Sequence, residues 1–167
     1  PQIERADCRT FFHAGSITGN DTYGRTGGGV NAYGTFNMYG GNITGNTSNY
    51  DTGGSGVSIE GVSDTTKASI FKLYGGKISE NTATSGGGVH VRRIAWYGPS
   101  EFYMYGGRIT KNNADSDAAS YGAGGGVYVS GTFNMYGGDI TGNSANYGGG
   151  VYVKRLPFMV KVPPFTN

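Results

Sequence analysis

Four side chains in one short stretch of the chain have the chemistry to bind a sugar. Arg92, Arg93, Trp96 and Tyr97 belong to the segment R-R-I-A-W-Y-G-P-S-E, residues 92–101, which contains the only tryptophan. The flat apolar faces of aromatic rings can stack on a sugar ring, and guanidinium groups bind acidic groups through paired hydrogen bonds. The segment therefore predicts a ligand-binding loop, with a glycan as its ligand. Alternatively, Trp96 packs this loop against the body of the protein.

Two series of regularly spaced residues are further candidates for a binding surface. A tyrosine after each F-x-[ML] motif forms either an aromatic platform for a polysaccharide chain or a stacked ladder that stiffens a corner. Its members are Tyr39, Tyr74, Tyr105 and Tyr136. A hydroxyl series resembles the threonine arrays of ice-binding proteins, although those surfaces normally have two parallel columns and this chain has one. Its members are Thr18, Thr44, Ser79, Thr110 and Thr141.

Acidic residues do not gather where an enzyme would need them. Enzymes that cleave acidic polysaccharides use paired carboxylates, or carboxylates that hold Ca²⁺, with a basic residue nearby. Here the acidic residues are scattered, and Asp115 and Asp117 share one loop with no partner in the sequence pattern. His90 has no second histidine or carboxylate at a fixed offset to complete a metal site. We therefore expect no catalytic residue, no cofactor and no metal.

These candidates are set in a repeat that predicts the fold. The motif I-x-x-N is followed by G-G-G-V, most clearly over residues 140–153, and a second block, F-x-[ML]-Y-G-G, separates successive copies. Self-similarity at a period of about 20 to 40 residues indicates stacked repeat units. Each unit contains three short segments with strand-like alternation: V-x-V, F-x-M-Y and I-T. Such strands are unstable alone but become stable when they are stacked.

Stacking the copies places chemically similar residues in columns. The apolar columns, which should face inward, are Val30, Val57, Val89, Val127 and Val151; Ala32, Ile59, Val91, Val129 and Val153; Phe36, Phe71, Phe102 and Phe133; Met38, Leu73, Met104 and Met135; and Ile17, Ile43, Ile78, Ile109 and Ile140. A further column should be a structural ladder whose amides hydrogen-bond to one another at a turn. It consists of Asn20, Asn46, Asn81, Asn112 and Asn143.

The predicted fold is all-β, a single-stranded right-handed parallel β-helix, or solenoid. It has about five coils with three short strands each, and the hand is that of most parallel crossovers. Residues 1–167 form one domain with the repeat core at 15–153. Residues 1–14 and 154–167 are expected to be caps or the ends of a fragment. The links at residues 60–70 and 92–101 are longer than the others, leave the same corner of adjacent coils and should touch.

Composition excludes several classes of partner. The chain of 167 residues has a net charge of +2 without a basic stripe, so we expect no nucleic-acid partner. A single cysteine cannot form an intrachain disulfide. No apolar run approaches the roughly 20 residues that a membrane helix needs, so we expect no membrane insertion. The 33 glycines lie at fixed places between apolar pairs, which is typical of tight turns between strands.

The motifs I-x-x-N and G-G-G-V resemble the F-x-x-N and G-G-A-[ILV] motifs of polymorphic outer-membrane-protein repeats, which are similar to autotransporter passenger domains. Ile replaces Phe and Gly replaces Ala. They are equally similar to the Gly-rich right-handed β-helix repeats of secreted and wall-attached proteins from gut bacteria. The resemblance covers residues 15–153 and implies a bacterial protein that is extracellular or on the cell surface, a stalk or adhesin without catalytic activity.

Three functional hypotheses follow. The first is a non-catalytic surface stalk or adhesin that binds a glycan, or a host or neighbouring cell surface, through the loop at residues 92–101. The second is a fragment of a polysaccharide-active enzyme, a lyase or hydrolase. The third is a module that self-associates end to end, because both ends of such a stack expose unpaired strands.

Overall fold

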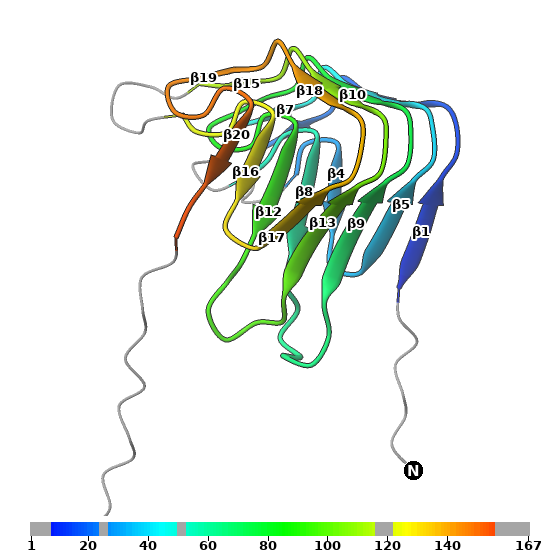
Figure 1. Ribbon diagram of the computed structural model, residues 1–167, viewed down its shortest axis with the longest axis vertical. Coiled ribbons are helices and arrows are strands. Elements are labelled where there is room, and N and C mark those ends of the chain that lie inside the picture. The colour runs from blue at the N-terminus through cyan, green and yellow to red at the C-terminus, as the bar shows by residue number, and fades with distance from the viewer. Residues whose placement is uncertain (1–7, 24–26, 50–52, 116–121, 156–167) are drawn as a thin grey trace, which may run out of the picture.

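The computed structural model describes residues 8–23, 27–49, 53–115 and 122–155. These residues form strands and turns but no helix, and therefore no helix with the length and hydrophobicity needed to cross a membrane. The strands lie in four parallel sheets of five strands each, consistent with a parallel β-solenoid (Figure 1). The chain visits sheets A, B, C and D in turn before it returns to sheet A, so neighbours within a sheet are far apart in sequence.

Sheets A and B are formed by the F-x-M and I-T segments. Sheet A contains β1 (Arg9–Phe12), β5 (Thr35–Met38), β9 (Ser69–Leu73), β13 (Ser100–Met104) and β17 (Thr132–Met135). Sheet B contains β2 (Ser16–Thr18), β6 (Asn42–Thr44), β10 (Lys77–Ser79), β14 (Arg108–Thr110) and β18 (Asp139–Thr141). Residues 9–12, which the sequence analysis placed outside the repeat, are part of sheet A. The register aligns Thr10 with Phe36 and Phe12 with Met38, so the F-x-M pattern is absent there.

Sheets C and D complete each circuit. Sheet C contains β3 (Asp21–Thr22), β7 (Thr47–Ser48), β11 (Thr82–Ala83), β15 (Asn113–Ala114) and β19 (Ser144–Ala145). Sheet D contains β4 (Val30–Ala32), β8 (Val57–Glu60), β12 (Val89–Arg92), β16 (Val127–Val129) and β20 (Val151–Val153). The expectation of three strands per coil is therefore wrong, because sheet C adds a fourth. Its strands of two residues are too short to show alternation in the sequence.

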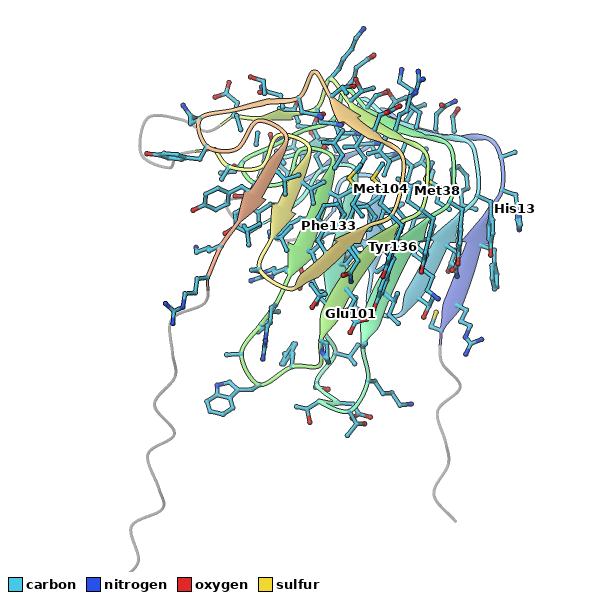
Figure 2. The ribbon with its side chains drawn as sticks, in the orientation of Figure 1. His13, Met38, Glu101, Met104, Phe133 and Tyr136 are labelled. Atoms are coloured by element: carbon cyan, nitrogen blue, oxygen red, sulfur yellow. The ribbon has the colours of Figure 1, made fainter. Side chains whose placement is uncertain are left out.

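The predicted apolar columns form the core in the expected register. Val57 pairs with Val89, Phe71 with Phe102 and Ile78 with Ile109. The apolar columns of the central coils are almost completely buried, as Met38 and Met104 illustrate (Figure 2). The rings of Phe36, Phe71, Phe102 and Phe133 stack on one another with centroid separations of 5.3, 4.8 and 4.9 Å. In-register parallel stacking thus buries each apolar side chain against a similar side chain of the neighbouring coil.

The asparagines form one continuous hydrogen-bonded ladder. The backbone N–H and the Nδ2 of Asn46 both donate to Oδ1 of Asn81, over 3.0 and 2.9 Å. Asn81 donates in the same way to Asn112. The Nδ2 of Asn81 also donates to the Ile43 carbonyl at 3.0 Å, and Asn46, Asn81 and Asn112 are buried. The amide side chain thus satisfies turn backbone that would otherwise be buried unpaired.

Glycine is required where the backbone of one coil passes the ladder asparagine of the following coil. A Cβ on Gly88 would lie 2.6 Å from the Gly126 carbonyl oxygen, 2.7 Å from Ile109 Cγ2 and 2.9 Å from Asn112 Nδ2. Gly56 and Gly126 have equivalent close neighbours. Gly56, Gly88 and Gly126 therefore let the chain approach the Ile and Asn of the following coil.

The outer face of sheet D is covered at its three middle strands, although alternation should turn the column of Asn31, Ser58, His90, Tyr128 and Tyr152 toward solvent. Glycine-rich backbone lies over it: a Cβ on Gly54 would be 2.4 Å from the His90 Cβ. Ser58, His90 and Tyr128 are consequently buried. The His90 ring contacts Tyr128 edge to face at 4.7 Å, and its Nδ1 has no hydrogen-bond partner. Burial, followed by the charges of Arg92 and Lys154, lowers the pKa of His90 from 6.5 to about 3.

Replacing one asparagine inside the ladder should be far more damaging than replacing one at its end. Asn81→Ala leaves the buried Asn46 backbone N–H and one hydrogen of Asn46 Nδ2 without an acceptor, and it removes a donor from the Ile43 carbonyl. A buried group left unpaired costs about 1–3 kcal/mol. We expect the free energy of unfolding to fall by at least about 3 kcal/mol. Asn20→Ala, at the exposed first position, should cost about 1 kcal/mol or less. Urea unfolding followed by circular dichroism measures both, and equal losses would contradict the ladder's role.

Acid should destabilise the fold through His90. Between pH 6.5 and about 3 the unfolded chain carries a proton on His90 that the folded chain excludes, so stability falls as the pH is lowered through this window. The slope contributed by one such group approaches about 1.4 kcal/mol per pH unit. His90→Gln should flatten the profile of unfolding free energy between pH 7 and 4. Parallel profiles for the variant and the wild type would show that His90 is not the responsible group.

Candidate functional site

The two long links between sheets D and A form one raised structure. Residues 61–68 connect β8 to β9, residues 93–99 connect β12 to β13, and Figure 1 shows them side by side beyond the sheets. The Gly98 N–H donates to the Val62 carbonyl at 2.7 Å, and the Ser69 N–H donates to the Pro99 carbonyl at 2.9 Å. The expectation that these loops touch is therefore confirmed.

Arg92 belongs to the base of the loops. It ends β12 and aligns with Glu60 in β8, and its Nη1 lies 3.2 Å from Glu60 Oε2. Glu60 is buried, and the Tyr33 hydroxyl lies 3.4 Å from the same Oε2. The Ser100 hydroxyl donates to the Arg92 carbonyl at 2.6 Å and closes the loop. Because Arg92 neutralises a buried carboxylate, it is not available to a ligand in the way that the sequence suggested.

The other three predicted residues lie together around a groove. It has a volume of about 350 Å³, and its walls are Thr65, Arg93, Trp96, Tyr97, Pro99, Ser100, Gly131 and Thr132. The Arg93 N–H donates to the Ser130 hydroxyl at 3.0 Å, which fixes this part of the loop to the next coil. One guanidinium, two aromatic rings and several small polar groups therefore line the same hollow. We refer to it below as the loop groove.

Trp96 is held outward in an unfavourable backbone conformation. Its side chain is 77% exposed and its φ is +72°. A bulky residue in the left-handed region costs about 1–3 kcal/mol. The Tyr97 N–H closes the turn by donating to the Ile94 carbonyl at 3.2 Å. The alternative that Trp96 packs the loop against the body is therefore wrong.

Thr132, which lines the loop groove, pairs with Glu101 of the neighbouring strand in sheet A. Glu101 and Tyr103 alternate outward along β13, and the Tyr103 hydroxyl donates to Glu101 Oε2 at 2.7 Å. That hydrogen bond, then partial burial and the Glu101 charge, raises the pKa of Tyr103 to about 12. The sequence analysis missed this pair. An acidic and a phenolic residue two positions apart on a strand were the available signal, because alternation places them on one face.

The tyrosine column is a stack rather than a row of separate platforms. Ring centroids lie 4.7, 5.0 and 5.2 Å apart from Tyr39 to Tyr136, with nearly parallel planes. His13 extends the stack, 4.9 Å from Tyr39, and Figure 2 shows His13 and Tyr136 on its first and last coils. The faces of Tyr74 and Tyr105 are covered by neighbouring rings. A sugar could reach only their edges and hydroxyls, so the geometry is that of the stiffening ladder.

The described residues contain no group that could form a metal site. Within the described ranges, no three residues of the types His, Cys, Asp and Glu lie close enough together to hold a metal ion. Asp117 lies outside the described residues. What the arrangement offers chemically is apolar ring stacking and one cationic hydrogen-bond donor group, in a groove that opens to solvent.

Comparisons with protein-family models, with curated proteins and with solved structures give no match for this chain. The resemblance to Gly-rich bacterial repeats therefore rests on the I-x-x-N and G-G-G-V motifs alone. Function has to be inferred from the loop groove and from the surfaces around it.

Proposed function

We propose that this chain is a non-catalytic β-helix segment of a bacterial surface or secreted protein, a stalk or adhesin that binds a glycan in the loop groove. The finer features of the fold belong to the same proposal: a right-handed coil, as parallel crossovers usually have, and five circuits. Of the stretches 1–14 and 154–167, expected to be caps or fragment ends, residues 9–12 form β1, and residues 1–7 and 156–167 lie outside the described residues. A rigid stack with a raised loop on one side suits the presentation of a binding site away from a surface.

The observation that carries this proposal is the state of Trp96. An apolar ring that is 77% exposed, on a backbone with φ of +72°, is unfavourable in two ways and gains nothing from packing. A ligand that stacks on the ring would recover the apolar contact that folding does not provide. Tyr97 and Arg93 line the same groove and give the ligand a second ring and a positive charge.

Arg93 favours glycans that carry an acidic group. Arg92 is occupied by Glu60, whereas Arg93 is exposed and lines the groove, so its guanidinium is the charge that a carboxylate or sulfate would meet. The nearby carboxylate, Glu101, accepts a hydrogen bond from Tyr103. A sugar hydroxyl could donate to Glu101 while the acidic group faces Arg93.

A polysaccharide-active enzyme is the weaker candidate. Glycoside hydrolysis generally uses two carboxyl groups about 5–9.5 Å apart across the scissile bond. None of the described residues that line the loop groove is acidic. The proposal is therefore binding without turnover.

Removing the exposed ring should weaken glycan binding without affecting the fold. Trp96→Ala should weaken binding of the best glycan from an array by at least about tenfold, or about 1.4 kcal/mol, because the stacking contact is lost. Arg93→Ala should weaken binding of acidic glycans only, with a loss that shrinks as salt is raised. Isothermal titration measures both affinities.

Tyr23→Ala is the matched control, because Tyr23 is 79% exposed but lies outside the groove. It should bind as the wild type does, and all three variants should keep the wild-type circular dichroism spectrum. If no glycan binds the wild type, or if Trp96→Ala and Tyr23→Ala bind equally well, the groove is not the recognition site.

A further inference from the structure

The loop groove ends where sheet A begins. Ser100 and Thr132, two of its lining residues, are the first residues of β13 and β17. Thr132 pairs with Glu101, and alternation directs both side chains to the outer face, because the phenylalanines that follow them belong to the core. In Figure 2 Glu101 lies toward the loop end of β13, and Tyr136 lies farther from the loops. A ligand that extends from the groove along these strands therefore meets the outer face of sheet A.

The outer face of sheet A carries polar side chains in rows across the strands. The row nearest the groove contains Ile70, Glu101 and Thr132, and the next row contains Lys72, Tyr103 and Asn134. All six side chains are at least partly exposed. The second row lies two residues farther along the strands, which is roughly 7 Å. The two rows thus offer hydrogen-bonding groups over a length greater than that of the groove alone.

Charge alternates along this path. Arg93 is exposed in the groove, Glu101 lies in the first row and Lys72 in the second, so the order is positive, negative, positive. Neither Arg93 nor Lys72 forms an ion pair with another described residue. The Tyr103 hydroxyl donates to Oε2 of Glu101 at 2.7 Å, which leaves Oε1 for a donor on a ligand. Two cations are therefore available on either side of one carboxylate acceptor.

We propose, on the basis of the glycan-binding function proposed above, that the ligand is a linear glycan in which acidic and neutral sugars alternate. It runs from the loop groove onto the outer face of sheet A. One acidic group pairs with Arg93, the neutral sugar donates a hydroxyl or amide hydrogen to Glu101, and the next acidic group pairs with Lys72. A glycan with an acidic group on every sugar would place one against Glu101, and the like charges disfavour that arrangement.

Isothermal titration with two series of oligosaccharides of increasing length tests this proposal. Hyaluronan fragments alternate acidic and neutral sugars, whereas every sugar of an oligogalacturonate is acidic. Lys72→Gln removes the far cation, and Glu101→Gln removes the negative charge but keeps an acceptor oxygen for Tyr103. The matched controls are Lys77→Gln and Glu80→Gln, which remove the same charges from β10 of sheet B and from the residue after it. Circular dichroism verifies the fold of each variant.

The wild type should bind hyaluronan fragments more tightly than oligogalacturonates. Its affinity for hyaluronan should rise by at least about tenfold once the fragments are long enough to reach Lys72. Lys72→Gln should lose that gain and bind short fragments as the wild type does. Glu101→Gln should bind oligogalacturonates at least about fivefold more tightly than the wild type does, because the repulsion is removed. Both control variants should match the wild type.

The extended site and the loop groove can fail separately. If Lys72→Gln matches the wild type at every fragment length, the extension onto sheet A is wrong. If the wild type prefers oligogalacturonates, or Glu101→Gln gains nothing with them, the alternation is wrong. In each of these cases the groove is upheld when short fragments bind the wild type and not Trp96→Ala. Absence of binding by every fragment to the wild type would overturn the extended site and the glycan-binding function together.

Discussion

The hydrogen bonds of the asparagine ladder are the constraint on which the other features depend. Asn81 receives two donors from Asn46 and gives its own to Ile43 and Asn112, so it joins three successive coils at one corner. The amide can do this only if the backbone of the preceding coil passes close by. That backbone is therefore glycine at Gly56, where a Cβ would lie 3.0 Å from Asn81 Nδ2 and 2.4 Å from the Gly88 carbonyl oxygen. The two sequence motifs are thus the two sides of one contact.

That constraint leaves the D-to-A corner free to vary. The ladder fixes the corner between sheets B and C, and stacked tyrosines with paired glycines occupy the corner between A and B. The link from D to A is short after β16 but eight residues long at 61–68, with no column of repeated residues. Insertions there leave the register of Phe71 and Phe102 intact. The raised loops, with the strained Trp96, are therefore tolerated at a corner where they do not disturb the pairing of the strands.

The sequence predicted the columns, because in-register stacking repeats the same chemistry at every coil. It did not predict sheet C, because strands such as β11 have only two residues. β1 was missed because Thr10 stands in the phenylalanine column. Of the four candidate site residues, Arg93, Trp96 and Tyr97 line one groove, whereas Arg92 continues β12 and pairs with Glu60. The burial of His90 depends on glycine backbone crossing over sheet D, which alternation along one strand cannot reveal.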